Sequence, residues 1–342
     1  MPSLLALFAS GAAFGPAVFA APQAAAPSQT SAQTQDALQS RLADLARRAA
    51  PAQMGIAVLD VASGKRWGID TDVPFIMMSV FKAPVAATVL SQIEAHKLSL
   101  EQQVTLLPGD LVEGSAIPSV GKKLRAGRTV FTVRELLTGA VSESDSTAAD
   151  ALVRLVGGPQ VVTAFLRRHG IAGMRVDTGE GGIGRVADHL RDGETIPAAE
   201  TAAQTLARER LGYADMLADP RNRSTPAAAV DFLRKLSAAE LLGPQSTQLL
   251  MDLMRRQTVP SRLRGGIPAG ADFADKTGSS STVGGSNAAW NDIAIMTLAD
   301  GRRICMAVFL KDTAMPKPDR DLLFADIARA VAAGVSARGA GR

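Results

Sequence analysis

Ser79 and Lys82 are the first pair of residues whose types and spacing indicate chemistry. On a helix, side chains three positions apart lie on one face, so the lysine amine would lie beside the serine hydroxyl. A buried amine in that place can accept the hydroxyl proton and turn the serine into a nucleophile. The positive end of the helix dipole would also stabilise an oxyanion formed nearby. The pair therefore indicates acyl transfer through a serine.

The same four-residue pattern occurs a second time, at Ser119 and Lys122, so the pattern alone discriminates little. Ser79 follows the apolar stretch 75–78 and precedes the apolar run 83–90, which predicts a buried helix start that could face a cleft. Ser119 lies among Pro, Gly and Lys residues, which indicate a solvent-exposed loop. We therefore expect Ser79 to be the nucleophile.

Two further short motifs follow in order along the chain. Ser-Asp-Ser occupies 144–146, immediately before a predicted helix, and Lys-Thr-Gly occupies 276–278, on a predicted strand. Each tripeptide alone is common, because the first also fits an ordinary helix N-cap. The ordered set, with each member in a fitting structural context, resembles the signature of class A serine β-lactamases and penicillin-binding proteins.

The resemblance to a class A β-lactamase extends over about 35–335. It is closer than the resemblance to penicillin-binding transpeptidases because of the stretches 155–170, 262–278 and 291–294. It implies hydrolysis of the β-lactam amide bond through a serine acyl-enzyme, and hence antibiotic resistance. Two alternatives use the same fold: a D,D-peptidase acting on peptidoglycan stem peptides, and a penicillin-binding sensor that stays acylated.

The resemblance also implies which residues move protons. Ser79 would attack the lactam carbonyl, Lys82 would accept or relay its proton, and Ser144 would protonate the leaving nitrogen. The family places a glutamate on an omega loop, where it activates the water that hydrolyses the acyl-enzyme. Glu180 fits that register, and Glu209 is the alternative base.

Substrate-binding roles follow from the same resemblance. Lys276, with Thr277 and Ser279, would bind the substrate carboxylate by charge and hydroxyl donors. The backbone N–H groups of Ser79 and Ser279 would form the oxyanion hole. Ser146 stands where the family usually has Asn, so we expect weaker discrimination among acyl side chains.

The omega-loop region departs from the family pattern in length and in the residues at its neck. The excess length lies mostly in 181–217, and Gly184 stands where the helper of the base is commonly Asn. Thr178 and Asn222 replace the familiar Arg–Asp pair at the neck. These departures predict a longer loop that is closed differently.

The hydrophobic pattern predicts strand-rich ends around a helical middle. A helix over 36–50 and strands at 55–61 and 66–69 come before the helical stretch, and strands at 274–277, 287–298 and 303–311 and a helix over 319–335 come after it. The expected fold class is α/β (an α+β sandwich), with an antiparallel sheet, flanking terminal helices and an inserted all-helical subdomain. The domain spans 35–338, with 35–74 and 257–338 as the α/β part and 75–256 as the helical part.

Composition excludes several other classes. Of 342 residues, 46% are hydrophobic and only 4% aromatic, and the basic residues are scattered, which argues against a nucleic-acid binder. The single cysteine, Cys305, excludes an intrachain disulfide and a thiolate-clustered zinc site. His96, His169 and His189 fit no metal-ligand spacing. We expect a monomer with a small β-lactam substrate, no metal and no cofactor.

The N-terminus reads as a targeting segment. An apolar stretch that ends near residue 20 is followed by sequence rich in Ala, Pro, Ser and Gln, which predicts a signal peptide at 1–20 and a flexible leader at 21–34. The expected location is therefore periplasmic or secreted, without membrane contact after cleavage.

Overall fold

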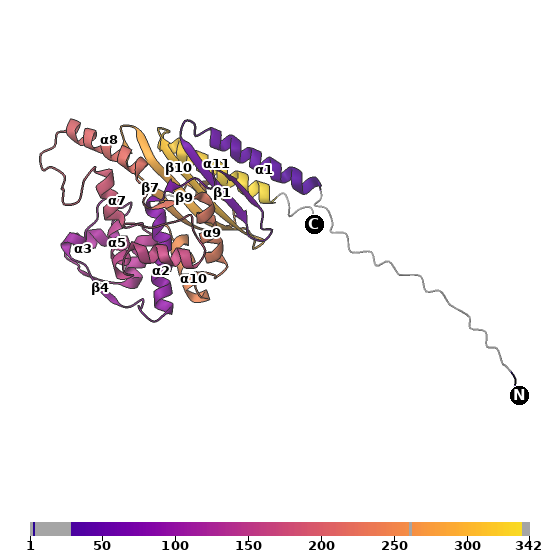
Figure 1. Ribbon diagram of the computed structural model, residues 1–342, viewed down its shortest axis with the longest axis horizontal. Helices are drawn as coiled ribbons and strands as arrows, with labels where there is room; N and C mark the ends of the chain where they lie inside the picture. The colour runs from indigo at the N-terminus through magenta and orange to yellow at the C-terminus, as the bar shows by residue number, and fades with distance from the viewer. Residues whose placement is uncertain (1–2, 4–28, 260–261, 337–342) are drawn as a thin grey trace.

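The structure is a computed structural model that describes residue 3 and residues 29–259 and 262–336 (Figure 1). The predicted signal peptide and the leader up to residue 28 lie, residue 3 apart, outside the described residues. Helix α1 (Gln29–Arg47) begins inside the segment 21–34 that the sequence predicts to be a flexible leader. The helix contains neither Gly nor Pro, the two residues that most disfavour a helix.

One six-stranded antiparallel sheet is built from both ends of the chain, with strand order β2-β1-β10-β9-β7 and β8 paired to β9. The strands are β1 (Gln53–Asp60), β2 (Arg66–Ile69), β7 (Asp272–Ser279), β8 (Thr282–Val283), β9 (Ser286–Thr297) and β10 (Arg303–Thr313). The central pair, β1 and β10, joins residues from opposite ends of the sequence. The expected fold class is confirmed.

Both faces of the sheet are covered, and successive residues of a strand contribute to different cores. In β1, Ile56 and Val58 pack with one hydrophobic cluster, whereas Ala57 and Leu59 pack with the other. The first cluster includes residues of α1 and of α11 (Lys317–Ser336), and Figure 1 shows these two terminal helices side by side on one face. Two-sided burial explains why β9 and β10 read as nearly continuous apolar runs.

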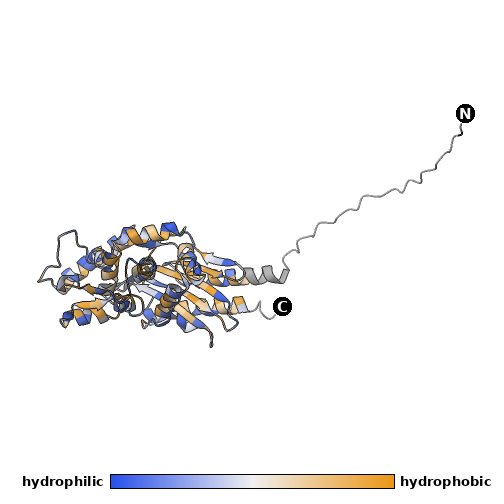
Figure 2. Cartoon of the chain, turned by 90° about the horizontal axis from the view of Figure 1, so that it is seen from below, coloured by the Kyte–Doolittle hydropathy of each residue, from blue (hydrophilic) through white to orange (hydrophobic). Residues whose placement is uncertain are grey.

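The second face of the sheet packs against the helical part of the chain. Its helices are α2 (Lys82–Glu94), α3 (Ser119–Arg125), α4 (Val133–Val141), α5 (Ser146–Leu155), α6 (Pro159–Arg168), α7 (Glu180–Ala187), α8 (Ala202–Ala218), α9 (Pro226–Ser237) and α10 (Pro244–Arg255). Figure 2 shows hydrophobic residues running through the strands and these helices. Within the described ranges no single helix is long and apolar enough to cross a bilayer, although the bent pair of α5 and α6 passes that test together.

The sequence predicted that this part is wholly helical, but the structure shows that it is not. Two short ladders interrupt it: β3 (Phe75–Ile76) pairs with β6 (Arg223–Ser224), and β4 (Gln103–Thr105) pairs with β5 (Val130–Thr132). Extended backbone leaves N–H and C=O groups that must be paired when they are buried, and each ladder pairs them between connecting segments. Strand β3 of the first ladder ends just before the predicted nucleophile, Ser79.

The extra length between 181 and 217 is largely helical. Helices α7 and α8 pack together where Gly212 comes so close to Ala187 that an added Cβ would lie 2.0 Å from the Ala187 carbonyl oxygen. The hydroxyl of Tyr213, on α8, donates to Asp312 Oδ1 at 2.5 Å, which ties the helix to the end of β10. The insertion is therefore held against the sheet and occupies a defined place beside it (Figure 1).

Candidate active site

Ser79 lies on a single 3-10 turn, Met78–Phe81, that leads directly into α2. The amide of Asn291, on β9, donates to the carbonyl oxygens of Ile76 and Met77 at 2.7 and 3.1 Å and holds the approach to this turn. On β7, Gly278 touches the turn so closely that an added Cβ would lie 3.1 Å from the Ser79 nitrogen. Sheet and turn therefore position the serine together.

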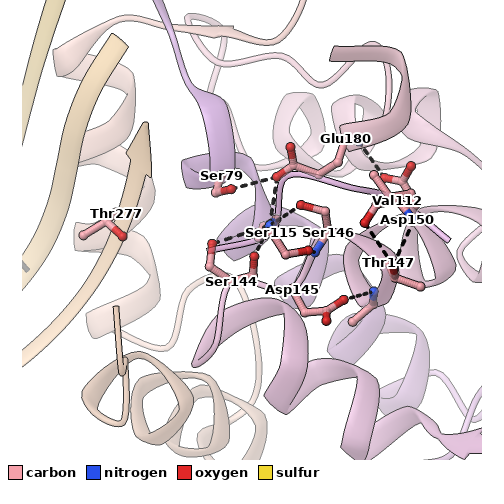
Figure 3. Close-up of polar contacts among 12 residues, drawn as sticks. Ser79, Val112, Ser115, Ser144, Asp145, Ser146, Thr147, Asp150, Glu180 and Thr277 are labelled. Carbon is pink, nitrogen blue, oxygen red and sulfur yellow. Dashed lines mark hydrogen bonds and ion pairs between the residues drawn. The ribbon is translucent and has the colours of Figure 1, made fainter. Parts of the chain in front are cut away.

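Ser79, Lys82 and Glu180 meet at one carboxylate oxygen, and Figure 3 shows the bond between Ser79 and Glu180. The Ser79 hydroxyl donates to Glu180 Oε1 at 2.8 Å, and Lys82 Nζ lies 2.9 Å from the same oxygen. Lys82 is fully buried and also donates to the backbone carbonyl of Ser144 at 2.7 Å. The hydroxyl is thus in direct contact with a carboxylate that can act as a base, and Lys82 contacts the same carboxylate oxygen.

The Ser-Asp-Ser motif forms the wall opposite Lys82. Asp145 is fully buried; its carboxylate accepts the N–H of Ala148 at 2.7 Å and caps α5, which fixes the motif at the helix start. Ser144 has a left-handed backbone (φ 57°), and its hydroxyl lies 3.4 Å from Lys82 Nζ. The Ser146 hydroxyl lies 3.4 Å from the same amine. Both serines therefore contact Lys82.

Lys276 lies across the cleft on β7. Its amine donates to the Ser144 hydroxyl at 3.0 Å, so the two predicted motifs are in direct contact. Burial and, to a smaller extent, the charge of Lys82 lower the pKa of Lys276 to about 7. Thr277 and Ser279 follow on the same strand and line the cleft with Ser79 and Ser144.

Sequence reasoning missed two polar residues behind β7. Gln257 accepts from Lys276 at 3.5 Å and from the Thr277 hydroxyl at 3.4 Å, and its amide donates to Asp275 at 2.6 Å. The buried guanidinium of Arg262 stacks 3.9 Å from the centre of the Trp290 ring, and burial lowers its pKa to about 10. Neither residue has a local signal, because each contacts the strand only through the fold.

Asp150 positions Glu180 and was also missed. Its two carboxylate oxygens accept the backbone N–H groups of Glu180 and Gly181, at 2.6 and 2.9 Å, at the start of α7. Burial raises the pKa of Asp150, and the charge of Glu180 adds to this rise. Asp150 lies one helical turn after Ser146 on α5, so both side chains lie on the same face of that helix.

The neck of the long loop is closed by an amide. The side-chain oxygen of Asn222 accepts the N–H groups of Asp177 and Thr178 at 2.7 and 3.0 Å, and its Nδ2 donates to the Thr178 carbonyl at 2.9 Å. Asn222 is buried, so these bonds are shielded from water. The Asp177 carboxylate also accepts the Asn222 N–H at 2.8 Å, so hydrogen bonds around Asn222 close the loop at this position in place of an ion pair with residue 222.

Two other candidates lie elsewhere. Glu209, the alternative base, is on α8 and lines the far side of the cleft, whereas the hydroxyl of Ser79 is bonded to Glu180. Ser119 is half-buried at the start of α3 and donates to Glu143, so the prediction of an exposed loop is wrong there. Pro118, which suggested a loop, instead precedes the helix, where proline does not disturb the helical hydrogen bonds.

The fold and this site are those of a serine hydrolase. Residues 37–335 match the family described as "Beta-lactamase enzyme family". The chain is 31% identical over 287 residues to extended-spectrum β-lactamase PER-1 of Pseudomonas aeruginosa, covering 81% of each chain. It is 32% identical over 284 residues to β-lactamase L2 of Stenotrophomonas maltophilia, covering 82% of this chain and 81% of that protein.

Solved structures give the same result. The reconstructed last common ancestor of Gram-negative class A β-lactamases superimposes with a TM-score of 0.71 at 33% identity, covering 87% of this chain and 99% of that chain. A β-lactamase from Chitinophaga pinensis gives 0.72 at 28% identity, covering 89% and 99%. The chain belongs to the beta-lactamase enzyme family, with class A enzymes as its relatives in fold.

Proposed function

We propose that the protein hydrolyses the amide bond of β-lactam antibiotics through an acyl-enzyme on Ser79, and so confers resistance. The observation that carries this proposal is the contact of the Ser79 hydroxyl with the Glu180 carboxylate at 2.8 Å, with Lys82 at 2.9 Å from the same oxygen. A penicillin-binding protein needs to activate the serine only once. A hydrolase must also activate a water, and Glu180 provides a base at the serine for that purpose.

In acylation, Ser79 Oγ bonds to the lactam carbonyl carbon while its proton passes to Glu180 or through Lys82. The negative charge on the carbonyl oxygen is stabilised by the N–H groups of Ser79 and Ser279, each worth on the order of 3 kcal/mol in comparable enzymes. The C–N bond then breaks, and the nitrogen takes its proton from Ser144, which lies 3.0 Å from Lys276 and can be reprotonated from there.

In deacylation, Glu180 takes a proton from a water whose oxygen attacks the ester carbonyl, and Ser79 leaves with a proton. Asp150 supports this step by holding the backbone of Glu180 in place. Lys276, Thr277 and Ser279 bind the substrate carboxylate at the other end of the cleft.

Turnover of a chromogenic cephalosporin tests the proposal against its alternatives. Steady hydrolysis with many turnovers per protein is expected. A single burst of one equivalent, followed by no further hydrolysis, would instead identify a penicillin-binding sensor or a D,D-peptidase.

We also propose that the protein acts as a monomer in the periplasm or outside the cell. Sedimentation of the purified protein tests the oligomeric state, and the N-terminal mass of exported protein tests the location.

The pKa of Lys276 predicts a pH profile. A lysine is charged below its pKa, so with a pKa of about 7 it loses its charge as the pH rises through neutrality. We expect kcat/KM for an anionic penicillin to fall above about pH 7, because kcat/KM reports the free enzyme. The bound carboxylate stabilises the ammonium, so kcat should hold to higher pH. Lys276→Arg, whose charge persists, should lose the alkaline fall, and a profile for the unmodified enzyme that is flat from pH 6 to 9 would contradict the assignment.

Close packing of Gly278 predicts a second effect. An alanine there would place its Cβ 2.4 Å from the Met77 carbonyl oxygen and would push the Ser79 turn away from β7. We expect Gly278→Ala to lose about 2 kcal/mol of stability and to slow turnover about a hundredfold. Thermal unfolding and chromogenic turnover measure both. Gly109→Ala, whose Cβ would meet nothing within 4 Å, is the matched control.

A further inference from the structure

The cleft continues past Ser79 into an open chamber with a cavity volume of about 150 Å³. The chamber shares Gly114 and the stretch 279–281 with the part of the cleft that holds Ser79 and Thr277. Its near end contains Ser146 and Glu180, and its far wall is made by the α7–α8 insertion. The extra length of this chain therefore forms part of the surface that a substrate meets.

The proposed reaction fixes which part of a β-lactam enters this chamber. With the substrate carboxylate at Lys276 and the lactam carbonyl at Ser79, the acyl side chain on the far side of the carbonyl extends toward Ser146 and Glu180. From there it reaches Tyr213 and Met216 on α8. The ring of Tyr213 is held by the bond of its hydroxyl to Asp312, so it presents a fixed flat surface. An aromatic acyl side chain fits such a wall.

Charge on the chamber wall is negative. No Lys, Arg or His side chain is found among its lining residues in the described part of the chain, and four carboxylates are. Three of these have basic partners: Glu180 pairs with Lys82, Glu113 with Arg125 and Asp188 with Arg208. The fourth is Glu209, half-buried on α8, for which the described residues supply neither a hydrogen bond nor an ion pair. Its charge is therefore the one that a ligand in the chamber would balance.

We infer that Glu209 selects β-lactams whose acyl side chain carries a positive charge, above all a protonated amine on the carbon beside an aromatic ring. This rests on the proposed function. The ring packs against Tyr213 and Met216, and the ammonium pairs with the Glu209 carboxylate. A side chain that carries a carboxylate at the same place is repelled by the Glu209 carboxylate, because like charges repel each other.

Three penicillins test the inference, since they differ at one carbon of the same side chain. Ampicillin carries an amine there, carbenicillin a carboxylate and benzylpenicillin only hydrogen. The measurement is kcat/KM for each, with benzylpenicillin as the reference. We expect the ratio of ampicillin to carbenicillin to fall about fivefold in Glu209→Gln, a typical value for a partly solvated ion pair. It should fall further in Glu209→Lys, which reverses the charge.

The control is Glu101→Gln, which removes one exposed carboxylate that pairs with Arg134 and does not line the cleft. It should keep the ratio of the unmodified enzyme. A ratio unchanged in both Glu209 variants, with thermal unfolding showing them folded, overturns the inference alone. If the unmodified protein turns over none of the three penicillins, the proposed function itself is overturned.

Discussion

Replacing Ser79 by alanine is expected to lower kcat for a chromogenic cephalosporin by about 10⁵-fold or more, as removal of a nucleophile does in other serine hydrolases. The substitution removes the oxygen that forms the acyl bond and leaves Lys82 bonded to Glu180 and to the Ser144 carbonyl. The site should therefore keep its geometry, and intact-mass measurement should find no acyl adduct with any penicillin.

Ser119→Ala is the matched control, because Ser119 begins the other Ser-x-x-Lys sequence on a helix of its own. It should retain the turnover of the unmodified enzyme. Turnover that survives in Ser79→Ala, or that disappears in Ser119→Ala while the protein remains folded, would contradict the choice of nucleophile.

Replacing Glu180 by glutamine is expected to trap the acyl-enzyme. An amide cannot accept a proton from water, so deacylation should slow about a thousandfold, within the range of general-base effects. Acylation should persist, because Lys82 retains its contact with Ser144. Mixed with benzylpenicillin, the variant should gain the mass of one whole penicillin, since the opened ring stays attached to Ser79.

Glu209→Gln is the informative comparison for this trap. Glu209 is on α8, away from the Ser79 hydroxyl, so its variant should hydrolyse benzylpenicillin without accumulating an adduct. An adduct in Glu209→Gln and none in Glu180→Gln would reverse the assignment of the base. Adducts in neither variant would show that another group activates the water.

Most of the sheet could be predicted from sequence, and so could the candidate site residues Ser79, Lys82 and Glu180, which the fold brings together. The strands have apolar and β-branched runs bounded by turns, and Ser79 and Lys82 are linked by helical spacing. Glu180 could be singled out only through the family resemblance, which places a glutamate on the omega loop. Each of these signals is local, or depends on the order of short motifs along the chain.

The supporting residues could not be predicted, because their contacts are made by the fold. Gln257 meets Lys276 and Thr277 from the loop after α10, and Asp150 caps a helix that begins thirty residues later in the chain. The sequence predicted the insertion as extra length but gave no indication of where it packs. Its position depends on the close approach of Gly212 to Ala187 and on the hydrogen bond from Tyr213 to Asp312, and neither contact has a signal in the local sequence.

The position of β1 between β2 and β10 has a consequence for the order in which the protein can fold. During synthesis β1 is made early, but its main partner, β10, is among the last segments produced. Until then β1 has only the short hairpin strand β2 beside it and presents a long apolar edge. Unpaired edges of this kind promote aggregation. A chain cut short before residue 303 should therefore be insoluble, because β1 would have no strand on the side that β10 occupies.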